Sequence, residues 1–541
     1  MNKFKLNILA LGMAALMLTA CAESFLDVQS ITEPTTDNFY KDAVDAEKAL
    51  IGCYGGWRET TSKGPWPAFY IASVMMADEC FGGGGSSDGD CQVVDRFNLS
   101  YNPSGIDMNE SLWIYSYQAI YRCNSLLIRM DEIEWEGDTI TRNRIEGETR
   151  AIRALVYFDM VRYFGHIPLV TEPTTDNVPQ ADPAKIYALI AEDLLFASNN
   201  IPEDAYPKAN ASSNDGRITC WAAKALLARV YLYYTGYYGA SDLAGVVNAS
   251  TVLQGLEDVI ASGEFSLVPE FKNLWPAASS MPIEGEEEFD STYAGDGNEE
   301  TVLAQKFNNS TTEWDGSSNN GNRWITMLGM RGQAHPPYAA GWGQCTVHPK
   351  MWNAYASNDE RRDASIINLV AEGIADDYDL GDQRDYTGYM IKKYVPMAYA
   401  NGADASGGDM QISQKQDYVV IRYADVLLMA AELGSSNAYD YYNQVRDRAG
   451  LSSREVTKDN ILEERMLEFA FEGLRYWDLL RQGIEYAASM IHEDGVSVLD
   501  LEVNSTVVID GNRIRETKGL TFIPANQISL SAGVLEQNEG W

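Results

Sequence analysis

The chain has 541 residues, 45% of them hydrophobic, so it can bury a large core and is long enough for several domains. Lys and Arg number 41 against 78 Asp and Glu, which gives a net charge of −37 at pH 7. Such a surface repels phosphate backbones, which argues against nucleic acid as a partner, and it tolerates neutral ligands. The 31 Tyr and 12 Trp residues also provide rings on which sugars can stack.

The first twenty residues are typical of a secretion signal. Lys3 and Lys5 precede an apolar run at 6–18 that is too short for a stable membrane span. Leu18-Thr19-Ala20-Cys21 follows and resembles a bacterial lipobox, so we expect Cys21 to be the lipidated first residue of the mature chain. Ordinary signal cleavage beside an incidental cysteine is the alternative. No later apolar run approaches the roughly 20 residues of a membrane helix.

Removing Cys21 leaves six cysteines, none of which has the CxxC spacing of a zinc or redox site. Outside the cytoplasm they can oxidise, and Cys80 and Cys91 flank a Gly-rich loop that a disulfide could close. Buried free thiols are the alternative. We interpret the glycine run 82–85 as a flexible surface hairpin, because no lysine or helix start follows at the spacing of a phosphate-binding loop.

Apolar residues recur at helical period along much of the chain. The expected helices cover 44–54, 113–127, 150–164, 183–197, 219–234, 252–260, 418–433, 437–449 and 461–481. Ala222, Ala225 and Ala228 would let a partner helix approach closely. Helices in pairs, with small residues at their crossings, indicate an α-solenoid of the tetratricopeptide kind, although no clean 34-residue period is visible.

The stretch from 262 to 416 is different. It is rich in Gly, Asn, Trp and Tyr and has no sustained periodicity, and a loop of this length is usually functional or disordered. Its tryptophans favour function. The acidic run Glu284–Asp290 is interpreted as a solvated loop; a calcium site is a second interpretation, although no EF-hand loop is present.

The segment 461–481, ILEERMLEFAFEGLRYWDLLR, has apolar residues around more than half of a helix surface, so it is expected to be mostly buried. A catalytic carboxylate pair is one interpretation of its acids. Opposite charges three and four residues apart favour a structural ion-pair network instead. Its predicted members are Arg465, Glu468, Glu472, Arg475 and Asp478.

The same segment resembles a family signature. ER, EFAFEG and R-x-W-D-L-x-R are similar to the pattern near the C-terminus of the SusD/RagB family, which are nutrient-binding surface lipoproteins of Gram-negative bacteria. Further stretches resemble the family in the same order. They are RALVYFDMVRYFGHIPLV, GRITCWAAKALLARVYLY, VIRYADVLLMAAE, YYNQVRDRAGL and FIPANQISLSAGVLEQNEGW.

The resemblance implies a mainly α fold, with about four tetratricopeptide-like helix pairs packed against an irregular, loop-rich lobe. The expected parts are a signal peptide at 1–20, an N-terminal part with the first ligand loop at 21–261, an insertion lobe at 262–416 and a C-terminal helical part at 417–541. It also implies an outer-membrane protein anchored through Cys21 and facing the cell exterior. A SusC-like TonB-dependent transporter would be its partner, and no cofactor would be needed.

A sugar platform needs aromatic faces with planar hydrogen-bonding groups nearby, and two stretches qualify. One is the loop after Ala77-Asp78-Glu79, which resembles the family segment before its ligand loops; the other is the middle insertion. The candidates are Phe81, Asp88, Arg96, Asn98, Tyr101, Trp314, Arg323, Trp324, Tyr338 and Trp342. Arg323-Trp324 is the first choice, because it joins a stacking face to a forked donor. Each ring could instead be a packing anchor for its loop.

No GxSxG, HExxH, P-loop or GxGxxG motif is present. We therefore expect capture of oligosaccharides by stacking and directed hydrogen bonds, without bond breaking. Two alternatives remain. The cargo could be peptide, as for some members of the family, or the chain could be a surface glycoside hydrolase, which would need two carboxylates at a set separation. A helical-repeat adaptor would leave the Trp-rich insertion unexplained.

Overall fold

The computed structural model describes residues 39–62, 66–208, 216–310 and 320–541. Eight helices form a succession in which each packs against the next. They are α3 (Ala43–Ser62), α6 (Glu110–Leu127), α7 (Thr139–Phe164), α8 (Pro183–Asn200), α10 (Cys220–Tyr238), α11 (Ala249–Ala261), α15 (Tyr423–Glu432) and α16 (Ala438–Arg448). They make four pairs in chain order, which confirms the predicted tetratricopeptide-like solenoid.

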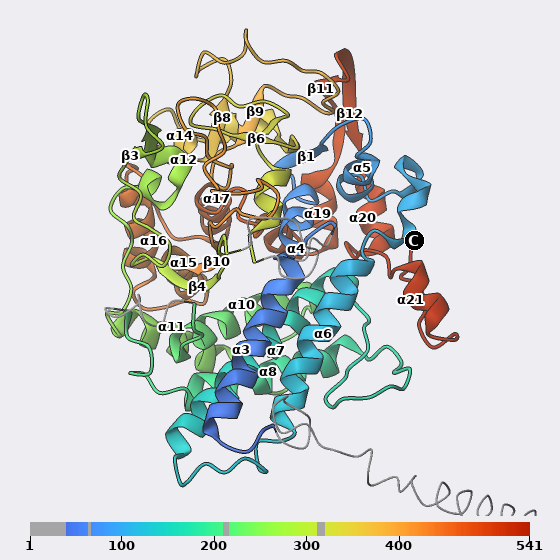
Figure 1. Cartoon of the computed structure of the whole chain (residues 1–541), viewed down its shortest axis with the longest axis vertical. Helices are drawn as coiled ribbons and strands as arrows, with labels where there is room; N and C mark the ends of the chain where they lie inside the picture. Colours follow the sequence, from blue (N-terminus) through green and yellow to red (C-terminus); the bar gives the residue numbers. More distant parts are fainter. Residues whose placement is uncertain (1–38, 63–65, 209–215, 311–319) are drawn as a thin grey trace, which may run out of the picture.

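Shorter helices and paired strands build the rest of the chain. The helices are α4 (Phe69–Met75), α5 (Gly89–Asp95), α12 (Pro276–Ser279), α13 (Pro349–Ala354), α14 (Arg361–Ser365), α17 (Lys458–Glu468), α18 (Arg475–Leu480), α19 (Ile484–Ile491), α20 (Gly511–Thr517) and α21 (Ala525–Leu530), with 3-10 turns η1 (Leu99–Tyr101), η2 (Pro103–Asp107), η4 (Phe271–Leu274) and η5 (Arg323–Met327). Figure 1 shows α3, α6, α7, α8, α10 and α11 in the lower half and most strands in an upper lobe.

The strands pair in twos rather than forming one sheet. The pairs are β1 (Cys80–Gly83) with β7 (Gln344–Val347), β2 (Ser280–Pro282) with β3 (Phe289–Ser291), β4 (Thr301–Gln305) with β10 (Tyr418–Arg422), β5 (Met330–Arg331) with β6 (Ala340–Gly341), β8 (Ile366–Asn368) with β9 (Tyr389–Ile391), and β11 (Glu493–Asp500) with β12 (Val503–Ile509). Only β5–β6 is parallel among these. The β1–β7 pair joins the N-terminal part of the chain to the insertion.

Side-chain caps fix where several helices begin. Asp182 accepts a hydrogen bond from the backbone N–H of Ala184, and Pro183 follows at the first helical position of α8. Gly165 ends α7 with φ of 72°, a conformation that glycine adopts without strain. None of the helices in the described residues is long and apolar enough to cross a membrane.

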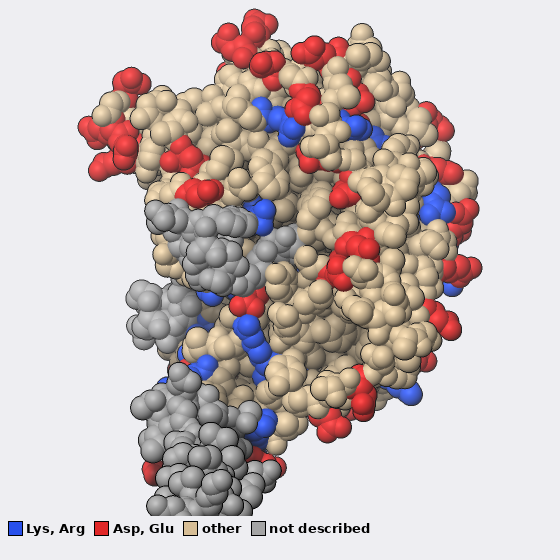
Figure 2. Space-filling view, turned by 45° about the vertical axis from the view of Figure 1, so that its right-hand side comes forward, with Lys and Arg blue, Asp and Glu red and all other residues tan. Residues whose placement is uncertain are grey.

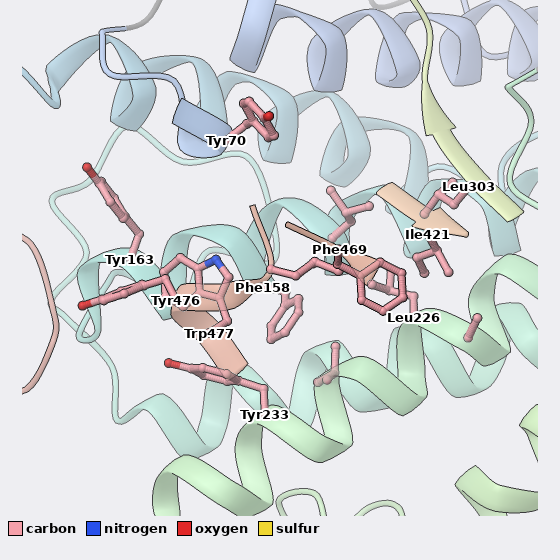
Figure 3. Close-up of a cluster of buried hydrophobic side chains, with 14 of the residues drawn as sticks. Tyr70, Phe158, Tyr163, Leu226, Tyr233, Leu303, Ile421, Phe469, Tyr476 and Trp477 are labelled. Atoms are coloured by element: carbon pink, nitrogen blue, oxygen red, sulfur yellow. The ribbon is translucent and has the colours of Figure 1, made fainter. Parts of the chain in front are cut away.

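A hydrophobic core joins the helices to the C-terminal segment (Figure 3). Phe158 of α7, Tyr233 of α10 and Trp477 of α18 meet there; the Trp477 and Tyr233 ring centroids are 5.9 Å apart. Trp477 also stacks on Phe69, with ring centroids 5.3 Å apart. The apolar face predicted for 461–481 therefore packs into the core.

The segment 461–481 is not one helix, so that part of the prediction was wrong. The chain leaves α17 after Glu468 and enters α18 at Arg475. Between them Phe471 and Gly473 take φ of 62° and 75°, which no α-helix accommodates. The hydroxyl of Tyr70 donates to the Phe471 carbonyl and satisfies one backbone group of this turn. Similarly, the predicted helix 418–433 begins as strand β10.

The five predicted members of the ion-pair network in this segment are buried and pair mainly with other elements. Arg465 donates to Asp478 at 2.8 Å and also to Asp425 of α15. Arg475 pairs with Asp78 at 2.8 Å. The structure thus places these charges in ion pairs, but across the fold rather than along one helix. Because each of these buried charges has a hydrogen-bonded partner, the pairing offsets the cost of removing it from water.

All six cysteines that the structure describes are buried free thiols, so Cys80 and Cys91 do not pair. The interpretation of glycines 82–85 as a flexible hairpin was also wrong, because all four are buried and three lie in or beside the β1–β7 pair. The acidic run 284–290, by contrast, lies at the β2–β3 turn with its glutamates exposed.

Candidate functional site

The two sequence stretches predicted to bind ligand meet in the upper lobe. A cavity of about 340 Å3 lies there, lined by residues 331–333, 341–342 and 379–382, and we call it the Trp342 groove. Its wall includes the parallel pair β5–β6, which places Arg331 beside Gly341. The loop at Ser86–Asp88 borders the groove through hydrogen bonds and an ion pair to its lining residues.

Arg331 organises the groove. Its Nε and Nη2 donate to the two oxygens of Asp382 at 2.5 and 2.9 Å, and its Nη1 donates to the Trp342 carbonyl at 3.1 Å. Asp88 lies 3.6 Å from Nη1. The hydrogen bonds from Arg331 hold the pKa of Asp382 well below its usual range, so this carboxylate is charged at any physiological pH.

The N-terminal loop approaches this guanidinium so closely that a side chain at position 85 would displace it. A Cβ added to Gly85 would lie 1.7 Å from Nη2 of Arg331. The Gly85 N–H donates to Asp88 at 2.7 Å, and the N–H of Ser86 donates to Asp382 at 3.1 Å. The glycine run therefore lets the loop backbone pack onto the insertion.

A buried network supports the loop. Arg96 pairs with Asp95 at 2.6 Å and with Asp385 at 2.9 Å. Gln92 donates to Asp385 at 3.0 Å and to the Gly83 carbonyl at 2.9 Å. Burial raises the pKa of Asp95 to about 7, against the opposing effect of Arg96. The network ties β1 and α5 to residue 385, which follows the groove wall in sequence.

Trp342 is the aromatic residue of the groove. Its side chain is half-buried, and its backbone N–H donates to Thr326 and Leu328 carbonyls at 2.8 and 3.1 Å. With Arg331 bound to its carbonyl, the backbone of Trp342 is held on both sides. The indole N–H makes no hydrogen bond with a described residue, so a ligand hydroxyl could accept it.

Four predicted ligand residues are corrected by their burial. Trp324 has no exposed surface and packs against Tyr70 with ring centroids 4.0 Å apart. Phe81 is equally buried, and Tyr338 is 3% exposed with its hydroxyl donating to Glu372 at 2.7 Å. Arg96 is occupied by Asp95 and Asp385. These side chains pack or position loops in this structure, because a ligand at the surface cannot reach them.

The other candidates differ in their availability. Asp88 borders the groove, and Tyr101 is 50% exposed with its ring 5.2 Å from the Arg96 guanidinium. Asn98 accepts from the N–H of Ser100 and caps η1. Arg323 is half-buried, and burial lowers its pKa. Trp314 and Cys21 lie outside the described residues.

Sequence reasoning missed Arg331, Gln333, Asp379 and Asp382. Gln333 accepts from the N–H of Asp379 at 3.0 Å and donates to its carbonyl at 2.6 Å, which fixes the opposite wall. The one available signal was the turn-forming run around Gly381. That signal says nothing about which other loop faces the turn.

A larger cavity of about 610 Å3 lies on the helical half, between α6, the loop 168–178 and α21. It does not contain any predicted ligand residue. Within the described residues, no group of three or more His, Cys, Asp or Glu side chains is arranged to hold a metal ion. The Trp342 groove is therefore the site that unites the predicted loops.

The described residues thus form a helical-repeat scaffold that carries a loop-built groove with an aromatic side chain in its wall. The chain belongs to the SusD family: its model matches residues 373–541, and a second model, described as starch-binding associating with outer membrane, matches residues 24–232. The two matches together cover more than half of the chain.

Similar proteins agree over nearly the whole length. A SusD-like protein P2 from Formosa agariphila is 24% identical over 506 residues, covering 89% of this chain and 91% of the relative. A SusD-like protein from Bacteroides ovatus is 25% identical over 503 residues, with 88% and 82% covered.

Solved structures share the fold. A laminarin binding SusD-like protein has a TM-score of 0.70 and 27% identity, covering 93% of this chain and all of that one. Surface glycan-binding protein A from Bacteroides thetaiotaomicron, in complex with laminarihexaose, has a TM-score of 0.71 and 24% identity, covering 92% and 99%.

Proposed function

We propose that this protein captures oligosaccharides at the outer surface of the outer membrane and delivers them to a SusC-like TonB-dependent transporter, without breaking bonds. Cys21 would carry the lipid anchor, and the helical half would lie against the transporter. The family membership and the glycan-binding relatives support this proposal.

The observation that carries the proposal is Trp342 in the wall of the Trp342 groove. A sugar ring can stack on the indole face, while Gln333, Asp379 and Asp382 offer planar hydrogen-bonding groups nearby. Because Arg331 holds Asp382 and the Asp379 backbone holds Gln333, these two side chains lose little entropy on binding.

Calorimetric titration of the chain from Ala22 onward against a glycan panel tests the proposal. We expect binding without release of product, and we expect Trp342→Ala to weaken it about tenfold or more, as for a buried aromatic anchor. Tyr439→Ala is the matched control, because Tyr439 of α16 is 55% exposed and does not line the groove.

Three results would contradict the proposal. They are no binding of any glycan, equal loss in both variants, or release of shortened sugars by the wild-type protein. The last result would favour the glycoside hydrolase alternative, and binding of peptides alone would favour the peptide-binding alternative.

A further inference from the structure

The charges of the Trp342 groove are unevenly balanced. One cation, Arg331, and two carboxylates, Asp379 and Asp382, line it, and Asp88 stands at its border. Asp376 and Asp377 are exposed in the segment that leads into the wall. Figure 2 shows acidic side chains scattered over the upper lobe with few basic ones among them.

The positive charge of Arg331 is already committed. Two of its nitrogens form a bidentate pair with Asp382, and the third donates to the Trp342 carbonyl and faces Asp88. Recognition of a carboxylate or sulfate normally uses a free Arg or Lys in such a fork. An anionic ligand would have to displace Asp382, which would leave that carboxylate without its partner.

Asp379, unlike Asp382, has no arginine among the described residues that neutralises its charge. It is exposed, its side chain accepts only the Gly381 N–H at 3.1 Å, and it forms no ion pair with any residue in the described part of the chain. A ligand carboxylate bound within about 6 Å of Asp379 would lie inside the screening length of physiological salt, so repulsion would persist.

From these contacts we infer that the Trp342 groove selects neutral oligosaccharides and rejects uronate and sulfated ones, with Asp379 as the main determinant. The inference rests on the proposed function. Arg384 is the nearby cation that could oppose it; it donates to the Ser86 carbonyl at 3.3 Å and does not line the groove.

Titration with size-matched probes tests this inference. The neutral probes are laminarihexaose, maltohexaose and xylohexaose, and the anionic probes are the hexamers of galacturonate and mannuronate. We expect every anionic hexamer to bind at least about tenfold more weakly than the neutral hexamer that binds most tightly. Asp379→Lys should reduce the ratio of the neutral to the anionic association constant. Asp379→Asn, which keeps an acceptor for the Gly381 N–H, should narrow it less.

Asp440→Lys is the matched control, because Asp440 is exposed on α16 and the substitution changes the net charge equally. Tight binding of an anionic hexamer, lost in Arg384→Gln, would overturn the inference and leave the proposed function standing. If neither Asp379 variant changed the ratio of neutral to anionic binding, Asp379 would not be the determinant of this selectivity. Failure of every hexamer to bind would overturn the proposed function and the inference together.

Discussion

Glu468 lies at the centre of a buried ion cluster that joins the insertion lobe to the helices. One of its oxygens is 2.8 Å from Arg422 and also accepts from Arg448, and the other is 3.1 Å from Arg361. Burial by itself would raise the pKa of Glu468, but the guanidinium groups of Arg448, Arg422 and Arg361 lower it far below its ordinary range. The carboxylate is therefore charged at any physiological pH.

Glu468→Gln keeps the shape of the side chain and removes the charge. Three guanidinium groups, all 5% exposed or less at their side chains, would then share fewer negative partners. Removing one member of a buried ion pair typically costs about 3–5 kcal/mol, which is a large part of the roughly 5–15 kcal/mol that stabilises a domain. We expect a loss of that size in the free energy of unfolding.

Urea unfolding followed by circular dichroism measures this loss. Glu463→Gln is the control, since its pair with Arg454 leaves the two side chains 48% and 42% exposed and should be worth about 1 kcal/mol or less. Hydrogen exchange should also quicken around Arg361, which lies in the lobe. A loss below about 1 kcal/mol for Glu468→Gln would refute the view that this cluster holds the lobe on the helices.

Two further predictions follow from buried contacts. Burial, with a smaller effect from Asp78, raises the pKa of Glu79 from 4.5 to about 8. Between these pH values the folded state keeps a proton that the unfolded state releases. The contribution of Glu79 to the free energy of unfolding is therefore full below pH 4.5 and is lost as pH rises through 8. Glu79→Gln should therefore raise the urea midpoint at pH 8.5 more than at pH 5, and equal shifts would contradict the argument. Gly85→Ala should displace Arg331 and weaken glycan binding about tenfold, as measured by calorimetry, whereas Gly52→Ala, which has open space around it, should not.

Much of the helical half could be read from the chain. Pro183 behind Asp182 marked the start of α8, and Gly165 marked the end of α7, because caps act through neighbours in sequence. The ends without such signals were less accurate: α7 begins at Thr139, eleven residues before the predicted start at 150. Residues 139–149 are mostly polar and show no apolar period, so the first turns of α7 were not predicted. Their burial comes from contacts with α8 and α3.

The candidate site was predictable only in part. The two loops were identified from composition, and Asp88 and Trp342 do border one groove. Trp324 was favoured because the neighbouring Arg323 adds a forked donor to its stacking face, but it is fully buried. The local pattern is the same for a ring that packs and a ring that binds. Which of them is exposed depends on Tyr70, Tyr394 and Tyr418, which come from distant segments and enclose Trp324.

Local chemistry controls three features that could be recognised from the chain: the helix pairs, the acidic surface and the charged residues that need buried partners. The features that depend on contacts between distant segments were set by the fold. It broke the 461–481 helix at Phe471, and it paired Arg331 with Asp382 beside Gly85. These contacts join residues tens to hundreds of positions apart, and no spacing along the chain records which loops will face one another.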